Sequence, residues 1–360
     1  MVRKKTTIFY EQKGFLIMSK FKFSVGPWNV HSGADAYGPA TREEIPFEEK
    51  IKTFKEMGFD AIQFHDDDAV PNMNDLTEAE IIEEAKKVKA LLDKYGLVAE
   101  FVAPRLWMDP RTTDGGFCSN SDSDREFALW RAYRSIDIAN ALGCDKIVLW
   151  LAREGTLCYE SKSPVEATKK LIDAINKMLE YDKNIKILIE TKPNEPIDRS
   201  VCPTMGHCMA VSAATIDPSR VGGLLESAHA MLAGLDPASE IGFAMAMGKL
   251  WGVHLNDQNG MKFDQDKSFG VENLRTAFNQ VKVLVENNFG ANGEYVGLDV
   301  KAMRTQSLEK SYAHLANSLK IFKALEEKAE KFDYEFQKKC VAERDYEALE
   351  MYVMELLMGL

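Results

Sequence analysis

A complete strand–helix–strand repeat lies in residues 144–191, CDKIVLWLAREGTLCYESKSPVEATKKLIDAINKMLEYDKNIKILIET. This repeat points to the fold. The segments 144–150 and 185–191 are short, nearly continuous apolar runs, as expected for parallel strands covered on both faces. Between them, residues 164–181 have the pattern of an amphipathic helix. This order predicts a parallel sheet with helical crossovers.

The same alternation continues on both sides of this repeat. Further predicted strands are 21–28, 61–66, 98–104, 221–227, 250–256 and 294–300, and further predicted helices are 76–96, 124–142, 270–287 and 306–327. Eight strands with helices between them, at roughly 35–45 residues per unit, predict an α/β fold, a (β/α)₈ TIM barrel. A doubly wound sheet is the second candidate, but the turn VGPWNVHSG lacks its glycine-rich phosphate motif.

The 360 residues fit one large barrel or about two ordinary domains. We expect the barrel to span residues 18–325, because a second methionine, Met18, opens the segment before the first strand. Residues 1–17 are then an N-terminal extension. Residues 326–360 are charged and amphipathic, and we predict a C-terminal helical arm that contacts another subunit. A solvated terminal helix is the alternative.

Composition excludes several classes of protein. The chain has 45 basic and 56 acidic residues, a net charge of −11, which argues against nucleic-acid binding. No apolar run approaches the roughly 18 residues of a membrane span, and Glu11, Gln12 and Lys13 interrupt any signal-peptide core. The six cysteines form no CxxC motif, which favours reduced thiols in a cytoplasmic protein.

Carboxylate or imidazole side chains follow five of the eight predicted strands, two of them with a lysine close by. They are His65, Asp66, Asp67 and Asp68, then Glu190 and Lys192, then Glu226 and His229, then His254, Asp257, Asp264 and Asp266, and finally Asp299 and Lys301. Catalytic groups of such barrels lie at the carboxyl ends of the strands. One polar strand end is expected by chance, but five in one barrel predict an active site.

The carboxylates among these residues indicate a metal centre. Glu190, Glu226 and Asp299 follow apolar runs, so they would repel one another in the barrel mouth unless cations neutralise them. Mg²⁺ and Mn²⁺ prefer oxygen ligands and tolerate an imidazole. Asp264 and Asp266, two residues apart, can face one ion and predict a second metal site. A solvated loop is the alternative for this pair.

Other strand-end residues suggest acid–base and binding roles. Asp68 can orient or charge the imidazole of His65 for proton transfer. Lys192 lies two residues beyond Glu190 and can polarise a carbonyl or alkoxide oxygen. An apolar wall around a sugar is predicted from three tryptophans near strand ends, with core packing as the alternative: Trp28, Trp107 and Trp150.

Seven blocks occur in the order of one known family. They are FHDDDAVP (64–71), DGGFCSN (114–120), LWLAREG (149–155), IETKPNEP (189–196), AHAMLAGL (228–235), HLNDQNGMKFDQDKSFG (254–270) and LDVKAMRT (298–305). Over residues 21–345 the chain resembles the xylose (glucose) isomerases of the shorter, actinobacterial-like class. The resemblance implies aldose–ketose isomerisation by a hydride shift from C2 to C1. It also implies two divalent cations that polarise O1 and O2, and no organic cofactor.

The resemblance also implies roles for single residues. The first metal would be held by Glu190, Glu226 and Asp299, with His254 at the family's fourth ligand position, and the second by Glu226, His229, Asp264 and Asp266. His65 and Asp68 would assist ring opening, and Lys192 would stabilise O1. Trp28, Trp107, Trp150, Asn256 and Lys301 would line the sugar pocket. Tyr37 matches an aromatic residue that enters a neighbouring subunit's site, which implies a homodimer or homotetramer.

Two departures bear on the chemistry. His254 replaces a family aspartate, which should shift the metal preference from Mg²⁺ towards Mn²⁺ or Co²⁺, and Asp257 is a candidate to restore the lost charge. Leu151 and Ala152 replace two family glycines and should crowd the mouth at the fourth strand.

Three functions remain open from the sequence. The first is a divalent-metal aldose–ketose isomerase acting on D-xylose, with D-glucose as a further substrate. The second, favoured by His254, is an epimerase or lyase that abstracts a proton from an unusual or oxidised sugar. The third is a non-catalytic sugar- or metal-binding relative with a damaged first site.

Overall fold

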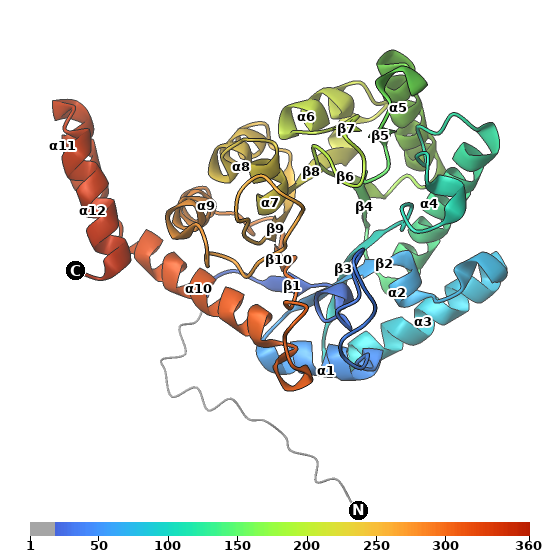
Figure 1. Cartoon of the computed structure of the whole chain (residues 1–360), viewed down its shortest axis with the longest axis horizontal. Coiled ribbons are helices and arrows are strands. Elements are labelled where there is room, and N and C mark those ends of the chain that lie inside the picture. The colour runs from blue at the N-terminus through green and yellow to red at the C-terminus, as the bar shows by residue number, and fades with distance from the viewer. Residues whose placement is uncertain (1–18) are drawn as a thin grey trace, which may run out of the picture.

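Eight parallel strands close into a barrel in the computed structural model, which describes residues 19–360 (Figure 1). The strands are β1 (Phe23–Val25), β2 (Ala61–His65), β3 (Val98–Ala103), β4 (Lys146–Trp150), β6 (Lys186–Glu190), β8 (Val221–Glu226), β9 (Leu250–Leu255) and β10 (Val296–Leu298). Strand β1 pairs with both β2 and β10, so the sheet has no edge. The predicted TIM barrel is confirmed, and the doubly wound sheet is excluded. The predicted extension 1–17 lies outside the described residues.

Helices surround this barrel (Figure 1). They are α1 (Phe47–Met57), α2 (Asp66–Ala69), α3 (Glu78–Tyr95), α4 (Asp122–Leu142), α5 (Pro164–Tyr181), α6 (Met205–Ala213), α7 (Ser227–Leu232), α8 (Pro237–Ala246), α9 (Leu274–Glu286) and α10 (Ala313–Glu330). Two short strands, β5 (Gly155–Thr156) and β7 (Arg199–Ser200), form a separate antiparallel pair. Among residues 19–360, no helix combines the length and apolar character needed to cross a membrane.

Single turns of 3₁₀ helix complete the connections. They are Pro27–Asn29, Met73–Asp75, Pro110–Thr112, Tyr159–Ser161, Pro218–Arg220 and Leu308–Lys310. The first of these follows β1 and carries Trp28 into the barrel mouth, where it meets His65.

Local sequence explains where the long helices begin and end. Thr77 accepts a hydrogen bond from the backbone N–H of Glu80, and Glu80 in turn caps the backbone of Thr77 at the start of α3. Gly96 then ends α3 in a left-handed conformation that glycine adopts without steric cost. Such a cap contributes about 1 kcal/mol to helix stability.

The barrel interior has its own small apolar cluster, separate from the main core between strands and helices. It consists of Phe101, Ala103, Val148, Leu188 and Leu224. Because β6 and β8 end at Glu190 and Glu226, two residues beyond Leu188 and Leu224, the carboxylates stand above this cluster. At β6 and β8 the barrel therefore presents charged groups at the mouth over a packed apolar cluster.

The last two helices extend away from the barrel (Figure 1). Helix α10 continues through residue 326, where we expected the arm to begin, and α11 (Tyr334–Glu343) and α12 (Tyr346–Met358) follow it. Lys328 Nζ donates a 2.5 Å hydrogen bond to the Leu356 carbonyl and so ties α12 to α10. A role for this arm in subunit contact stays a prediction.

His314 in α10 should make folding stability depend on pH. Burial, together with the nearby positive charges of His31 and Arg42, lowers the pKa of His314 to about 4, while its Nε2–H donates to the Asn29 carbonyl at 2.8 Å. The folded pKa lies below the ordinary value near 6.5, so this residue's contribution is complete above about pH 6.5 and declines as the pH falls towards 4. The stability lost through this residue between pH 7.5 and pH 5 is about 2 kcal/mol.

Urea unfolding of the wild type and His314→Gln at the two pH values measures this contribution. The variant should lose less stability than the wild type on acidification, by about 2 kcal/mol. Equal losses in both proteins would contradict the assignment.

Candidate metal centre

Four side chains from four adjacent strands meet at the barrel mouth. Glu190 ends β6, Glu226 ends β8, His254 is the penultimate residue of β9, and Asp299 directly follows β10. Each offers one ligand atom, and these atoms lie within 4.8 Å of one another. His254 Nδ1 is 3.5 Å from Glu190 Oε1, 4.0 Å from Glu226 Oε2 and 3.8 Å from Asp299 Oδ2.

A second group adjoins the first and shares Glu226 with it. His229, on the short helix α7 after β8, has its Nε2 3.2 Å from Glu226 Oε1 and 2.9 Å from Asp264 Oδ2. The ligand atoms of these three residues also lie within 4.8 Å of one another. Glu226 therefore joins two candidate cation positions.

Charge in the two groups is unbalanced without cations. Burial and the neighbouring carboxylates Asp264 and Asp299 raise the pKa of Glu226 well above its usual value. Burial also opposes ionisation of Glu190 and His254, but their mutual attraction outweighs it, so the pKa of Glu190 falls to about 2 and that of His254 rises to about 9. Divalent cations at these positions would remove the repulsion among the carboxylates.

Unpaired buried atoms show that these residues fit a metal. Both ring nitrogens of His254, His229 Nδ1 and Asp264 Oδ1 have no hydrogen-bond partner although they are shielded from water. Leaving such atoms unpaired costs about 1–3 kcal/mol each, which coordination would offset. Carboxylate and imidazole donors together suit Mg²⁺, Mn²⁺ or Co²⁺.

Asp266, predicted as a ligand, lies beside the second group rather than in it. It forms an ion pair with Lys301 Nζ and accepts a 3.0 Å hydrogen bond from Asn256 Nδ2. The same Asn256 amide donates to Glu226 Oε1 at 2.8 Å. Asn256 therefore orients the shared carboxylate, and Lys301 balances the charge of Asp266.

Asp257 does not replace the charge lost at His254, so that expectation is wrong. Its carboxylate accepts hydrogen bonds from the backbone N–H groups of Glu272 and Asn273, at 2.8 and 3.0 Å. These bonds hold Asp257 at the chain segment leading into α9, away from both ligand groups.

Lys192 borders the second group as a charged donor. Its Nζ lies 2.8 Å from Asp264 Oδ2 and 5.0 Å from the centre of the Trp150 ring. Burial would lower the pKa of Lys192, but attraction to Asp264 outweighs burial and raises it. The ammonium therefore stays protonated beside the ligands.

His65 and Asp68 lie together as the sequence predicted, and the positively charged side chain of Arg105, which was not predicted, joins them. His65 Nδ1 is 3.1 Å from Asp68 Oδ2, and Arg105 Nη2 is 2.6 Å from the same nitrogen and 3.2 Å from Asp68 Oδ1. Arg105 directly follows the third predicted strand, so the rule that found the other strand-end residues applied to it as well. Arg105 and Asp68 fix the orientation of the imidazole.

A family model described as a xylose isomerase-like TIM barrel matches residues 51–290. The chain belongs to this family. The solved structures with which it shares the fold include a D-tagatose 3-epimerase-like protein, at 18% identity and a TM-score of 0.59, covering 84% of this chain and 98% of that one. An L-ribulose 3-epimerase is 14% identical with a TM-score of 0.63, over 86% and 96% of the two chains. A 3-keto-D-glucoside 4-epimerase from E. coli is 16% identical with a TM-score of 0.57, over 82% and 98%.

These matches support a broader family assignment than the resemblance seen in the sequence. The family model places the chain in the xylose isomerase-like family as a whole. The solved structures named above are two sugar epimerases and one epimerase-like protein, and none is named a xylose isomerase. At such low identities the structural likeness shows the fold.

In this xylose isomerase-like barrel, three tryptophans surround the mouth. Trp107 and Trp150 pack edge to face at 4.4 Å, and Trp28 and Trp107 contact His65 at 4.3 and 5.0 Å between ring centres. Trp28 Nε1 also donates a 2.8 Å hydrogen bond to Asp299 Oδ1. Trp28 is therefore both a wall residue and an orienting partner of a candidate ligand.

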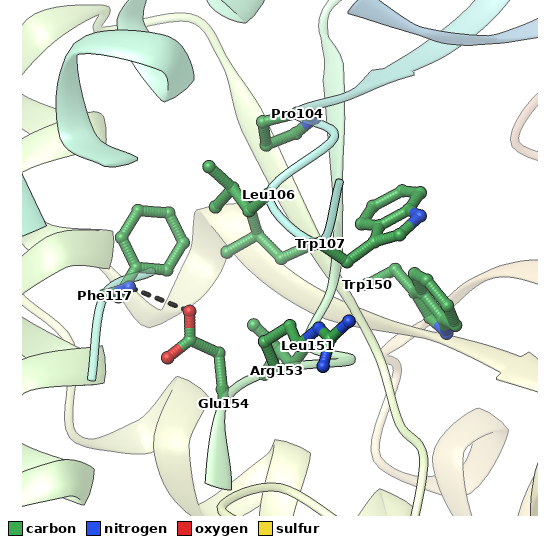
Figure 2. Close-up of a pocket in the computed structure, with 9 residues that line it drawn as sticks. Pro104, Leu106, Trp107, Phe117, Trp150, Leu151, Arg153 and Glu154 are labelled. Carbon is green, nitrogen blue, oxygen red and sulfur yellow. Dashed lines mark hydrogen bonds between the residues drawn. The ribbon is translucent and has the colours of Figure 1, made fainter. Parts of the chain in front are cut away.

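Figure 2 shows a small crevice behind Trp107 and Trp150, with room for about one water molecule. Apolar side chains, including Leu106, Phe117 and Leu151, line it. Glu154 accepts hydrogen bonds from three successive backbone N–H groups, at Gly116, Phe117 and Cys118, at 2.7–2.9 Å.

Tyr37 lies apart from these residues. It is 86% exposed in the loop after β1, in a turn closed by the Asp35–Gly38 bridge. Its insertion into a neighbouring subunit stays a prediction.

Proposed function

We propose that this protein is a divalent-metal-dependent sugar isomerase that interconverts an aldose and its ketose, D-xylose and D-xylulose first, with D-glucose and D-fructose as a second pair. The observation that carries this proposal is the pair of ligand groups joined through Glu226, with the charged Lys192 beside them. Membership of the xylose isomerase-like family and the seven sequence blocks support it.

Glu190, Glu226, His254 and Asp299 would hold one cation, and Glu226, His229 and Asp264 a second. When bound, the cations would polarise two neighbouring oxygens of the open-chain sugar as Lewis acids. The chain then has to hold the sugar's reacting end against these positions and keep water out.

The chain's own residues meet these needs. Lys192 Nζ donates a hydrogen bond to the oxygen on which negative charge develops, where one donor of this kind contributes about 10²–10³-fold in rate. His65, held by Asp68, moves a proton at the ring oxygen or its hydroxyl during ring opening. The tryptophan wall covers the apolar face of the sugar and shields the reacting carbons from solvent protons.

Epimerisation through a deprotonated carbon is the second candidate. It is favoured by His254, an imidazole where xylose isomerases have a carboxylate, and by the named activities of the solved epimerases. In that reaction a base removes the proton next to a carbonyl, and the proton returns to the opposite face.

Metal removal and restoration tests the proposal. Protein stripped with a chelator should give no product, and adding back Mg²⁺, Mn²⁺ or Co²⁺ should produce ketose from D-xylose or D-glucose, supplied separately. An epimer of the supplied sugar would favour the second candidate. No turnover of either sugar with any of the three ions would overturn the proposed isomerase.

His254→Asp is expected to shift the metal preference of the enzyme. A carboxylate at this position adds a hard oxygen ligand and a negative charge, so the ratio of kcat/KM with Mg²⁺ to that with Mn²⁺ should rise by about tenfold. His207→Asp, an exposed change on α6, is the matched control. An unchanged ratio in His254→Asp would mean that His254 does not contact the cation.

A further inference from the structure

A buried polar cluster lies inside the barrel next to His254, and the proposed reaction does not use it. It consists of Ser24 on β1, Gln63 on β2 and Glu100 on β3, all nearly inaccessible to solvent. Gln63 Nε2 donates to Ser24 Oγ and to Glu100 Oε2, at 3.1 Å each. Polar groups in a barrel interior are costly to bury, so this cluster needs an explanation.

Strand register brings the cluster to His254. Ser24 pairs with Gly297, and Gly297 pairs with His254, so the three positions lie side by side on β1, β10 and β9. A Cβ atom at Gly297 would come within 2.4 Å of Gln63 Nε2 and 3.1 Å of His254 Cδ2. The missing side chain at Gly297 is therefore what allows the Gln63 amide and the His254 ring to approach each other.

The two edges of the His254 ring face different surroundings. The contacts with Glu190, Glu226 and Asp299 are all made through Nδ1, whereas Cδ2, bonded to Nε2, lies beside Gly297, which the Gln63 amide also borders. A neutral imidazole that ligates a metal through Nδ1 carries its single hydrogen on Nε2, and that N–H requires an acceptor.

An acceptor of the right kind stands on Gln63. The Glu100 carboxylate only accepts hydrogen bonds when ionised, so it holds the nitrogen of the Gln63 amide and leaves the oxygen free. Gln63 Oε1 is buried with no partner, and so is His254 Nε2. Gln63 Oε1 lacks a hydrogen-bond donor, and His254 Nε2 lacks an acceptor once Nδ1 ligates a cation.

We propose that Gln63 is a positioning residue for His254. Its Oε1 accepts the Nε2–H of His254 when a divalent cation binds at Nδ1, and Ser24 and Glu100 hold the amide in that orientation. Gln63 then fixes both the tautomer and the angle of the imidazole. The proposal concerns metal binding alone and does not depend on which sugar reaction follows.

Gln63→Met tests it, because methionine keeps the length of the side chain and removes the acceptor. Mn²⁺ affinity, measured by titration of the chelator-treated protein, should fall by about 10–100-fold, and the visible absorption spectrum of the Co²⁺-loaded protein should shift. Gln337→Met, the same change on α11 outside the barrel, is the control, and its Mn²⁺ affinity should stay within about threefold of the wild type. Wild-type affinity and an unchanged Co²⁺ spectrum in Gln63→Met would overturn the proposal.

A measurement on the wild type guards against a variant that fails to fold. In protein labelled with ¹⁵N-histidine and saturated with Mg²⁺, the His254 signals, assigned by their loss in His254→Asn, should show a proton on Nε2 and none on Nδ1. A proton on Nδ1 would overturn the proposal. Neither readout involves a sugar, so failure here is distinguishable from failure of the proposed function.

Discussion

Replacing Glu226 by Gln is expected to abolish sugar turnover, with kcat/KM lowered by about 10⁴-fold or more. Glu226 is the single carboxylate that both ligand groups contain, so the change weakens two cation positions at once. Glutamine keeps the size of the side chain and an oxygen that can still accept from Asn256 Nδ2. The loss should therefore reflect missing negative charge rather than a collapsed barrel.

Two measurements distinguish the loss of negative charge from a collapse of the barrel: the metal content after dialysis and the thermal midpoint of the metal-free protein. Glu226→Gln should retain less metal than the wild type while its metal-free form unfolds at a similar or higher temperature, because a buried, repelled carboxylate has been neutralised. Glu166→Gln, on the exposed face of α5, is the control and should retain both metal and activity. A Glu226→Gln protein with wild-type metal content and more than about a tenth of the activity would contradict the shared-ligand assignment.

Lys192→Met should lower kcat by about 10²–10³-fold with little change in KM. The ammonium of Lys192 stands beside Asp264 and over Trp150, where it can donate to an oxygen that gains charge only as the reaction proceeds. Because Asp264 loses a positive neighbour, the affinity of the second group for a cation should be kept or increased.

Steady-state kinetics with each metal at saturation measures this effect. Lys262→Met, in the exposed loop after β9, changes the same kind of side chain outside the site and should leave kcat unaltered. If Lys192→Met also leaves kcat unaltered, the role assigned to Lys192 is wrong.

The barrel was predictable because its strands are buried on both faces. Runs such as 185–191 and 221–227 are nearly continuous apolar stretches, with Lys186 the one polar residue before the strand ends, and the observed strands Lys186–Glu190 and Val221–Glu226 lie within them. Helices α3, α4 and α5 correspond to the predicted helices 76–96, 124–142 and 164–181. Helices α1, α6, α7 and α8 were not predicted, and the three after α1 are short and carry little charge.

The clustering of strand-end residues followed from the topology, but the orientation of each side chain did not. Asp264 and Asp266 are two residues apart in one loop, yet Asp264 faces His229 and Lys192 while Asp266 faces Lys301 and Asn256. These partners come from other strand ends, so local spacing carried no signal for the difference.

Gln63 shows the same limit within the barrel. In the sequence it is one polar residue in an apolar strand, AIQFHD, and nothing local pairs it with His254. The pairing depends on strand register and on the absence of a side chain at Gly297.

Isomerisation in D₂O is the measurement that tests the central claim most directly. Protein stripped with a chelator and reloaded with Mg²⁺, Mn²⁺ or Co²⁺ would be given D-xylose in D₂O, and the product examined by NMR. We predict D-xylulose that forms only with metal and carries no deuterium at C1, because a hydride shift keeps the migrating hydrogen within the sugar. Deuterium at C1 would show that the reaction proceeds by proton abstraction instead of a hydride shift. D-xylulose formed equally well without metal would contradict the assignment of the metal centre.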